Sequence, residues 1–159
     1  MNDPFVTYLH DHLAGARFAI EILEDLGKQA ADEPAAMLAR RLLPQVEADR
    51  AVLEALAKRC GDGGSALKEA SAWIAQKASR LKLRLGADAE FAAFEAVEIL
   101  SLGVQGKASL WRAIAELPAT DERRRGLDFT RLIEQALNQF EEIEKVRLEL
   151  AKVVFNRPE

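Results

Sequence analysis

Four long stretches of this chain repeat apolar residues at three- and four-residue steps, the period of one face of an α-helix. In the first stretch the repeat runs from Phe5 through Leu9 and Leu13 to Leu26. No segment alternates apolar and polar residues for long, so strands are not expected. Helices with one apolar face are stable when they pack against each other. We therefore expect an all-α protein, a four-helix bundle that forms a single domain over residues 1–159.

Capping residues and prolines indicate where the first two helices begin. Asp3-Pro4 and Asp32-Glu33-Pro34 each place a proline at the start of an apolar repeat, where its missing N–H costs nothing. These signals predict helices over about 4–31 and 34–60. Pro44 lies inside the second and should kink or break it, because it removes a backbone hydrogen bond.

The rest of the chain predicts one short helix and two long ones. A Gly-rich turn precedes a shorter helix expected over about 65–85. A long helix follows over about 88–117, and another, capped by Thr120, runs towards the C-terminus. If the short helix is a crossover, the second and third long helices run parallel, as in ferritin-like folds. An up-down-up-down bundle with tight turns, or a five-helix bundle with the short helix folded back, is the alternative.

Charge and cysteine content exclude several classes of protein. The formal net charge of -4 argues against a general nucleic-acid binder. The single cysteine, Cys60, allows neither an intrachain disulfide nor a Cys-rich zinc site, and it suits a reducing compartment. No signal peptide and no run of about 18 apolar residues is visible, so we expect a cytoplasmic protein without membrane contact.

A di-iron site in a helical bundle needs one carboxylate from each of two helices and a Glu-x-x-His from each of the other two. The corresponding segments here are Glu47-Ala48-Asp49-Arg50 and Glu144-Lys145-Val146-Arg147. Arginine presents only donors and stays protonated, so it cannot replace histidine as a ligand. It can supply the positive charge of a metal. We therefore expect no metal and no cofactor, but a salt-bridged core with Arg50 and Arg147.

A polar layer is the sharpest site hypothesis that the sequence supports. In an up-down bundle, His12, Asp49, Glu98 and Arg147 would all lie about 11 to 16 Å from one end, judged by the helical rise. With a ferritin-like crossover Glu98 would leave this layer, whereas His12 and Asp49 would stay level. Such residues more often lie at the edge of a core. Further candidates for the polar core are Glu47, Arg50, Glu144 and Gln105.

Two glycines interrupt the long helix expected over 88–117. Gly103 and Gly106 each cost about 1 kcal/mol relative to alanine in a helix interior, so some feature of the fold should compensate. The glycines could line a groove for a ligand or a partner helix. Close helix packing beside Trp111 is the interpretation that we favour.

Two segments carry a resemblance to a known group of proteins: Tyr8-Leu9-His10-Asp11-His12-Leu13-Ala14-Gly15-Ala16 and Glu98-Ile99-Leu100-Ser101-Leu102-Gly103-Val104-Gln105-Gly106-Lys107. They resemble an uncharacterised bacterial group of ferritin-like helical bundles. This resemblance implies a helical bundle and often a dimer. It does not carry over di-iron activity, because Arg50 and Arg147 stand where the histidines are needed.

These patterns favour a non-catalytic bundle, a homodimer that acts as an interaction or small-molecule-binding module for an unknown ligand. We assign no catalytic residue. The alternative is an atypical metal-binding protein or oxidoreductase that uses carboxylates and His12.

Overall fold

Four long helices make up most of the computed structural model, which describes residues 3–31, 33–61, 72, 75–76 and 88–158. They are α1 (Pro4–Gly27), α2 (Pro34–Cys60), α4 (Ala89–Ala115) and α5 (Phe129–Phe155), with a 3₁₀ turn, η1 (Glu122–Arg124), before α5. The expected all-helical architecture with four long helices is confirmed. The shorter helix expected over 65–85 falls almost entirely outside the described residues.

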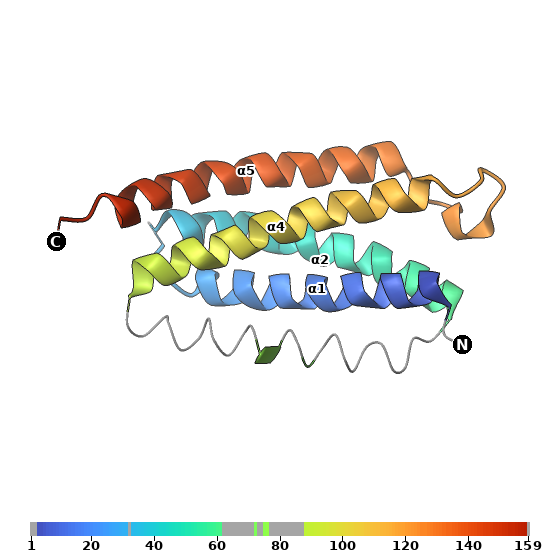
Figure 1. Ribbon diagram of the computed structural model, residues 1–159, viewed down its shortest axis with the longest axis horizontal. Coiled ribbons are helices and arrows are strands. Elements are labelled where there is room, and N and C mark those ends of the chain that lie inside the picture. The colour runs from blue at the N-terminus through green and yellow to red at the C-terminus, as the bar shows by residue number, and fades with distance from the viewer. Residues whose placement is uncertain (1–2, 32, 62–71, 73–74, 77–87, 159) are drawn as a thin grey trace.

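The four helices form two antiparallel pairs that lie side by side (Figure 1). α1 packs against α2, α4 packs against α5, and the two pairs meet through α1 with α4 and α2 with α5. α2 ends at the end of the bundle where α1 begins, whereas α4 begins at the opposite end (Figure 1). α2 and α4 therefore run in the same direction, which excludes an up-down-up-down order with tight turns only.

Aspartate caps explain where three of the long helices begin. The side chains of Asp3, Asp88 and Asp128 accept hydrogen bonds from backbone N–H groups in the first turns of α1, α4 and α5. Our prediction that Thr120 caps the last long helix is therefore wrong, because Asp128 caps α5. Asp121 caps η1 instead. Gly126 has a φ of 75°, which is not a helical value, and it lies between η1 and the start of α5.

Pro44 does not break α2, which runs as one helix from Pro34 to Cys60. The side chain of Pro44 is exposed, so the carbonyl that loses its partner lies on the solvent side of the helix. The link between α1 and α2 is held by Arg40, whose guanidinium donates to the backbone carbonyls of Gly27 at 2.8 Å and Gln29 at 3.0 Å.

The apolar core is divided into two clusters along the bundle axis. The larger cluster includes Leu23, Leu38 and Leu100, and the smaller includes Leu9 and Trp111. On α2 the boundary falls between Val46 of the larger cluster and Leu53 of the smaller one, and the buried Asp49 lies between them. A buried polar side chain thus lies where the two apolar clusters meet.

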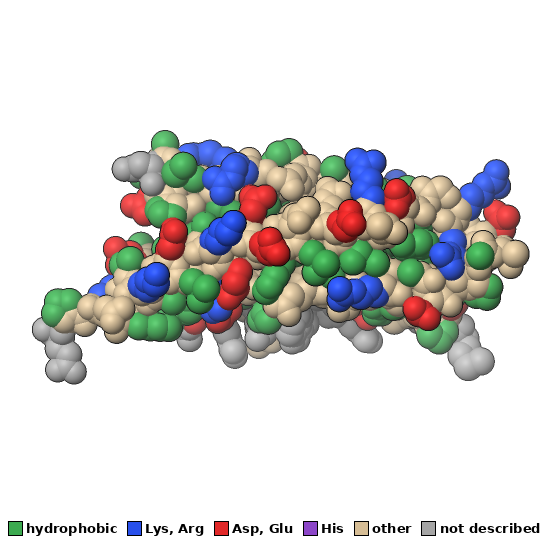
Figure 2. Space-filling view, turned by 90° about the horizontal axis from the view of Figure 1, so that it is seen from above, with side chains coloured by type: hydrophobic (Ala, Val, Ile, Leu, Met, Phe, Trp, Pro, Cys, Tyr) green, Lys and Arg blue, Asp and Glu red, His purple; other side chains and the backbone are tan. Residues whose placement is uncertain are grey.

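The surface seen from above carries basic and acidic side chains side by side, with hydrophobic side chains exposed between them (Figure 2). This face therefore presents no extended patch of one charge. None of the described helices combines the length and apolar content that crossing a membrane requires.

Candidate functional site

Three polar side chains from three helices meet in the interior of the bundle. Asp49 of α2 and Gln139 of α5 are only 7% and 1% exposed. Lys107 of α4 donates hydrogen bonds from Nζ to Asp49 Oδ2 and to Gln139 Oε1. Gln139 Nε2 donates in turn to Asp49 Oδ2 at 3.1 Å and to Gln45 Oε1 at 3.3 Å. We call Asp49, Lys107 and Gln139 the buried polar cluster.

The electrostatics of this cluster are those of a desolvated ion pair. Burial lowers the pKa of the Lys107 amine from its ordinary value, and the nearby carboxylate of Asp49 opposes that shift. Two charges withdrawn from water are tolerated when they neutralise each other and their remaining polar atoms are hydrogen-bonded. Gln139 contributes here, since its amide accepts from Lys107 and donates to Asp49.

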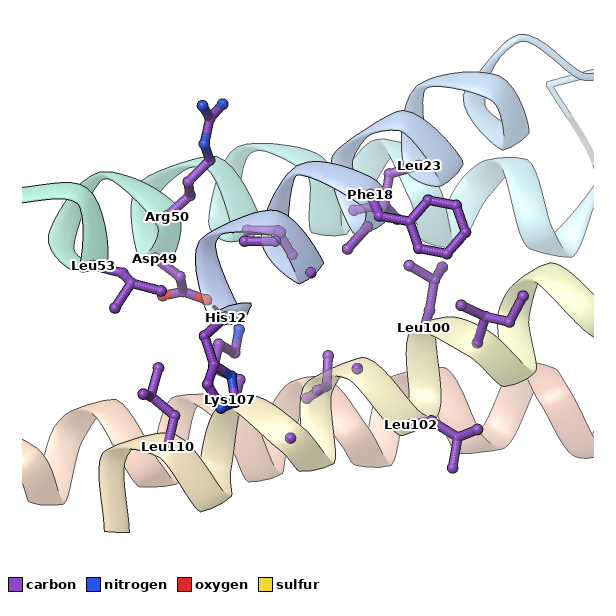
Figure 3. A pocket seen from close by; sticks show the side chains of 18 of the residues that line it. His12, Phe18, Leu23, Asp49, Arg50, Leu53, Leu100, Leu102, Lys107 and Leu110 are labelled. Atoms are coloured by element: carbon purple, nitrogen blue, oxygen red, sulfur yellow. Dashed lines mark hydrogen bonds and ion pairs between the residues drawn. The ribbon is translucent and has the colours of Figure 1, made fainter. Parts of the chain in front are cut away.

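A cavity of about 780 Å³ lies next to the buried polar cluster, between α1 and α4 and against α2. Its lining residues extend from Asp11 to Leu23 on α1 and from Ile99 to Trp111 on α4, about 18 Å along each helix axis. In Figure 3, His12, Asp49 and Lys107 lie together near one end. Most of the remaining lining residues are apolar or glycine.

Glycines make this cavity possible. Gly15 of α1 and Gly103 and Gly106 of α4 all line it, and a Cβ atom added at any of them would meet no atom of the described residues within 4 Å. Among the described residues no other helix approaches Gly103 or Gly106 closely, so they give no support to our expectation of close helix packing beside Trp111. The groove interpretation fits the described residues, because none of the described helices fills the space that the missing side chains leave. The sequence alone does not separate these two interpretations, because a glycine pair in a helix is compatible with a groove and with close helix packing.

His12 lies at the polar end of the cavity, as part of α1. Its ring packs edge-on against Tyr8, with the ring centroids 4.7 Å apart. Burial lowers the pKa of His12 below its ordinary value of 6.5, although the charge of Asp11 opposes the shift. His12 is therefore neutral at pH 7 and can serve as a hydrogen-bond donor or acceptor. His12 and Asp49 both line this cavity. These are the two residues that the sequence predicts to lie at one level when the connection is a crossover.

Glu98 and Arg147, the other two residues of the expected layer, belong to a separate group of ion pairs between α4 and α5. Arg147 of α5 donates from Nη1 to Glu98 of α4 at 3.1 Å and from Nε to Glu144 at 2.9 Å. Ser101 donates to Glu144 at 3.3 Å. His12, Asp49, Glu98 and Arg147 thus do not form one layer. The physical reason is topological: α4 starts at the opposite end of the bundle from the one assumed for the layer, so Glu98 lies far along the axis from Asp49.

The four further candidates for the polar core take no part in the buried polar cluster. Glu47 and Gln105 are exposed, because each is on the solvent side of its helix. The buried Nε of Arg50 has no hydrogen-bond partner in the described structure, and Figure 3 shows its side chain pointing away from Lys107. The cation that pairs with Asp49 is therefore Lys107, not Arg50. Glu144 is half-buried and paired with Arg147.

The apolar repeats of α4 and α5 indicate that Lys107 and Gln139 face the interior, although neither is among the site residues expected from the sequence. Leu100, Val104, Lys107 and Trp111 follow one another at four, three and four residues, and Lys107 therefore occupies an inward position of α4. Gln139 likewise lies three residues after Ala136 and four before Ile143, both buried. A polar residue at an inward step of an apolar repeat identifies a buried polar cluster without reference to any metal motif.

The Arg147 ion pairs should contribute modestly to stability, and in a pH-dependent way. Arg147 lowers the pKa of Glu144 below its ordinary value of 4.5, so the ion pair stabilises the fold above that pH. The stabilisation is lost as the pH falls through the lower pKa of the folded state. Replacing Arg147 by Met should cost about 1 kcal/mol at pH 7, since the pair is partly exposed. Thermal unfolding of both proteins from pH 7 to pH 3 should show this difference shrinking below pH 4.5; a constant difference would contradict the assignment.

The described side chains at the site offer hydrogen bonds and one ion pair. In the described parts of the chain, no three His, Cys, Asp or Glu side chains are grouped so that they could hold a metal ion. The buried polar cluster already contains a fixed cation, the Lys107 ammonium, against the carboxylate of Asp49. Comparison with known proteins finds no protein-family model, curated protein or solved structure that matches this chain.

Proposed function

We propose that this chain is a ferritin-like helical bundle that binds an apolar small molecule in the cavity between α1 and α4. The observation that carries the proposal is the open space beside three glycines, in a cavity with largely apolar walls. Pockets of this size, with a few polar groups at one end, are typical of small-molecule sites. Each glycine weakens its helix, and a ligand that occupies the space would account for the lost stability.

Two features support the ferritin-like part of the proposal. α2 and α4 run parallel, which in a four-helix bundle needs one long connection between them. The ion pair of Lys107 with Asp49 supplies, in the interior of the bundle, the charge neutralisation that metal ions supply in di-iron proteins. In this proposal the ancestral metal chemistry is replaced by binding. The homodimer and the cytoplasmic location stay predictions from the sequence.

Filling the cavity tests the proposal. Replacing Gly106 by Leu should abolish binding of the uncharged fluorescent probe N-phenyl-1-naphthylamine, because the new side chain occupies the space that the probe needs. Ala55→Leu is the matched control, since it places the same leucine side chain at an exposed position of α2 that does not line the cavity. Fluorescence titration should show wild-type affinity for this control. Equal probe binding by Gly106→Leu and wild type would contradict the proposed site.

The smaller substitution Gly106→Ala should separate stability from binding. It should raise the free energy of unfolding by about 0.5 to 1 kcal/mol, since alanine favours the helix and the added Cβ meets no atom of the described residues within 4 Å. The same variant should bind the probe more weakly than wild type. Urea unfolding and the fluorescence titration measure the two effects. Loss of stability would show that the space beside Gly106 is not open.

A further inference from the structure

We propose that the ligand is a single-chain alcohol, with its hydroxyl at the buried polar cluster and its hydrocarbon chain along the rest of the cavity. This inference rests on the proposed function and adds the chemical class of the ligand. It follows from the shape of the cavity, from the balance of charges at its polar end and from the hydrogen bonds available there.

The shape of the cavity favours an extended chain. Its polar lining residues His12, Asp49 and Lys107 lie towards one end, whereas Leu23, Leu42 and Ile99 line the other. Ile99 and Lys107 are eight residues apart on α4, which corresponds to about 12 Å along the axis. An extended chain advances by roughly 1.2 Å per bond, as in the polypeptide backbone, so about ten chain atoms fit beyond the polar cluster.

The charges at the polar end favour an uncharged head group. Asp49 and Lys107 neutralise each other, and His12 is neutral at pH 7 because burial lowers its pKa. A carboxylate would have to compete with Asp49 for Lys107, and an ammonium would be repelled by Lys107. The other charged lining residues do not alter this balance, since Asp11 is exposed and the Arg50 side chain points away from Lys107 (Figure 3).

The available hydrogen bonds favour a hydroxyl among uncharged heads. Both hydrogen bonds that Asp49 accepts from described side chains, from Lys107 and Gln139, reach Oδ2. Oδ1 can accept a hydrogen bond from the hydroxyl group, and a hydrogen bond to a carboxylate is stronger than one between neutral groups. The neutral imidazole of His12 can donate to the hydroxyl oxygen. A hydroxyl both donates and accepts, as this site requires.

Three probes with the same ten-carbon chain test the head group by isothermal titration calorimetry: decan-1-ol below its solubility limit, and decanoate and decyltrimethylammonium below their micelle concentrations. Wild-type protein should bind decan-1-ol more tightly than either charged probe, by about tenfold or more, because a charged head disturbs a buried ion pair. Asp49→Asn leaves Lys107 without its counter-ion and should shift the preference to decanoate. Lys107→Gln leaves Asp49 unpaired and should shift the preference to decyltrimethylammonium.

The outcomes distinguish this inference from the proposed function. If none of the three probes binds to wild type, the proposed function and the inference fall together. If decanoate or decyltrimethylammonium binds wild type most tightly, the cavity remains a binding site and the alcohol assignment is wrong. An unchanged order of affinities in a variant that keeps its helical circular dichroism would also overturn it. The wild-type order decides the question even if both variants unfold.

Discussion

Replacing Asp49 by Ala should lower the free energy of unfolding by about 3 to 5 kcal/mol, the largest effect expected for any polar residue of this chain. The substitution leaves the Lys107 ammonium buried without its counter-ion and removes an acceptor from Gln139. Removing one partner of a buried ion pair costs far more than the pair contributes, because the remaining charge has no compensation. Urea unfolding followed by circular dichroism at pH 7 measures the loss.

Two further variants show whether the loss arises from the unpaired charge. The double variant Asp49→Ala with Lys107→Met removes both charges and should recover most of the stability, since apolar replacements of buried ion pairs are often neutral. Glu47→Ala removes an exposed carboxylate two residues away and should change stability by no more than about 0.5 kcal/mol. If Asp49→Ala costs no more than Glu47→Ala, Asp49 is not part of a buried ion pair.

Replacing Trp111 by Ala should destabilise the bundle by about 3 to 5 kcal/mol. Trp111 is 1% exposed and packs in the smaller apolar cluster with Leu9, Leu53 and Leu56. Its removal loses the transfer free energy of the indole and leaves a void that the helices can close only in part. The measurement is again the free energy of unfolding in urea, with the slope checked for two-state behaviour.

Leu102→Ala is the matched control for this substitution on the same helix. Leu102 is 63% exposed, so its truncation should change stability by no more than about 0.5 kcal/mol. Trp111 also forms part of the cavity wall, and its removal should enlarge the cavity and alter probe affinity. A similar, small cost for both variants would mean that the end of the bundle around Trp111 is not packed as described.

The helices themselves could be predicted well, because their signals are local. Asp3 followed by Pro4 starts α1, and Asp88 starts α4, as the cap residues indicated. The start of α5 could not be placed, because Thr120, Asp121 and Asp128 all qualify as caps and only the folded chain selects among them. The direction of α4 relative to α2 depends on the connection between them. The sequence pattern is compatible with a crossover and with a short helix that folds back, so it does not fix this direction.

The candidate site was predicted in part. His12 and Asp49 were placed at one level because both depend only on the short link between α1 and α2, and both line the cavity. The sequence does not identify Lys107 as the partner of Asp49, because the Glu-x-x-Arg segments indicate Arg50 as the cation. The partner of a buried charge is set by packing between helices, which no spacing within one helix determines. The cavity likewise depends on how far apart α1 and α4 lie.

A crystal structure of protein purified without chelators, with anomalous scattering recorded above the iron, manganese and zinc edges, would show whether an ion pair or a metal ion neutralises Asp49 inside the bundle. We expect Lys107 Nζ within hydrogen-bond distance of Asp49 and Gln139, and no anomalous peak beside them. A metal ion coordinated by Asp49, with the Lys107 side chain displaced from the interior, would contradict this expectation and favour a metal-binding protein.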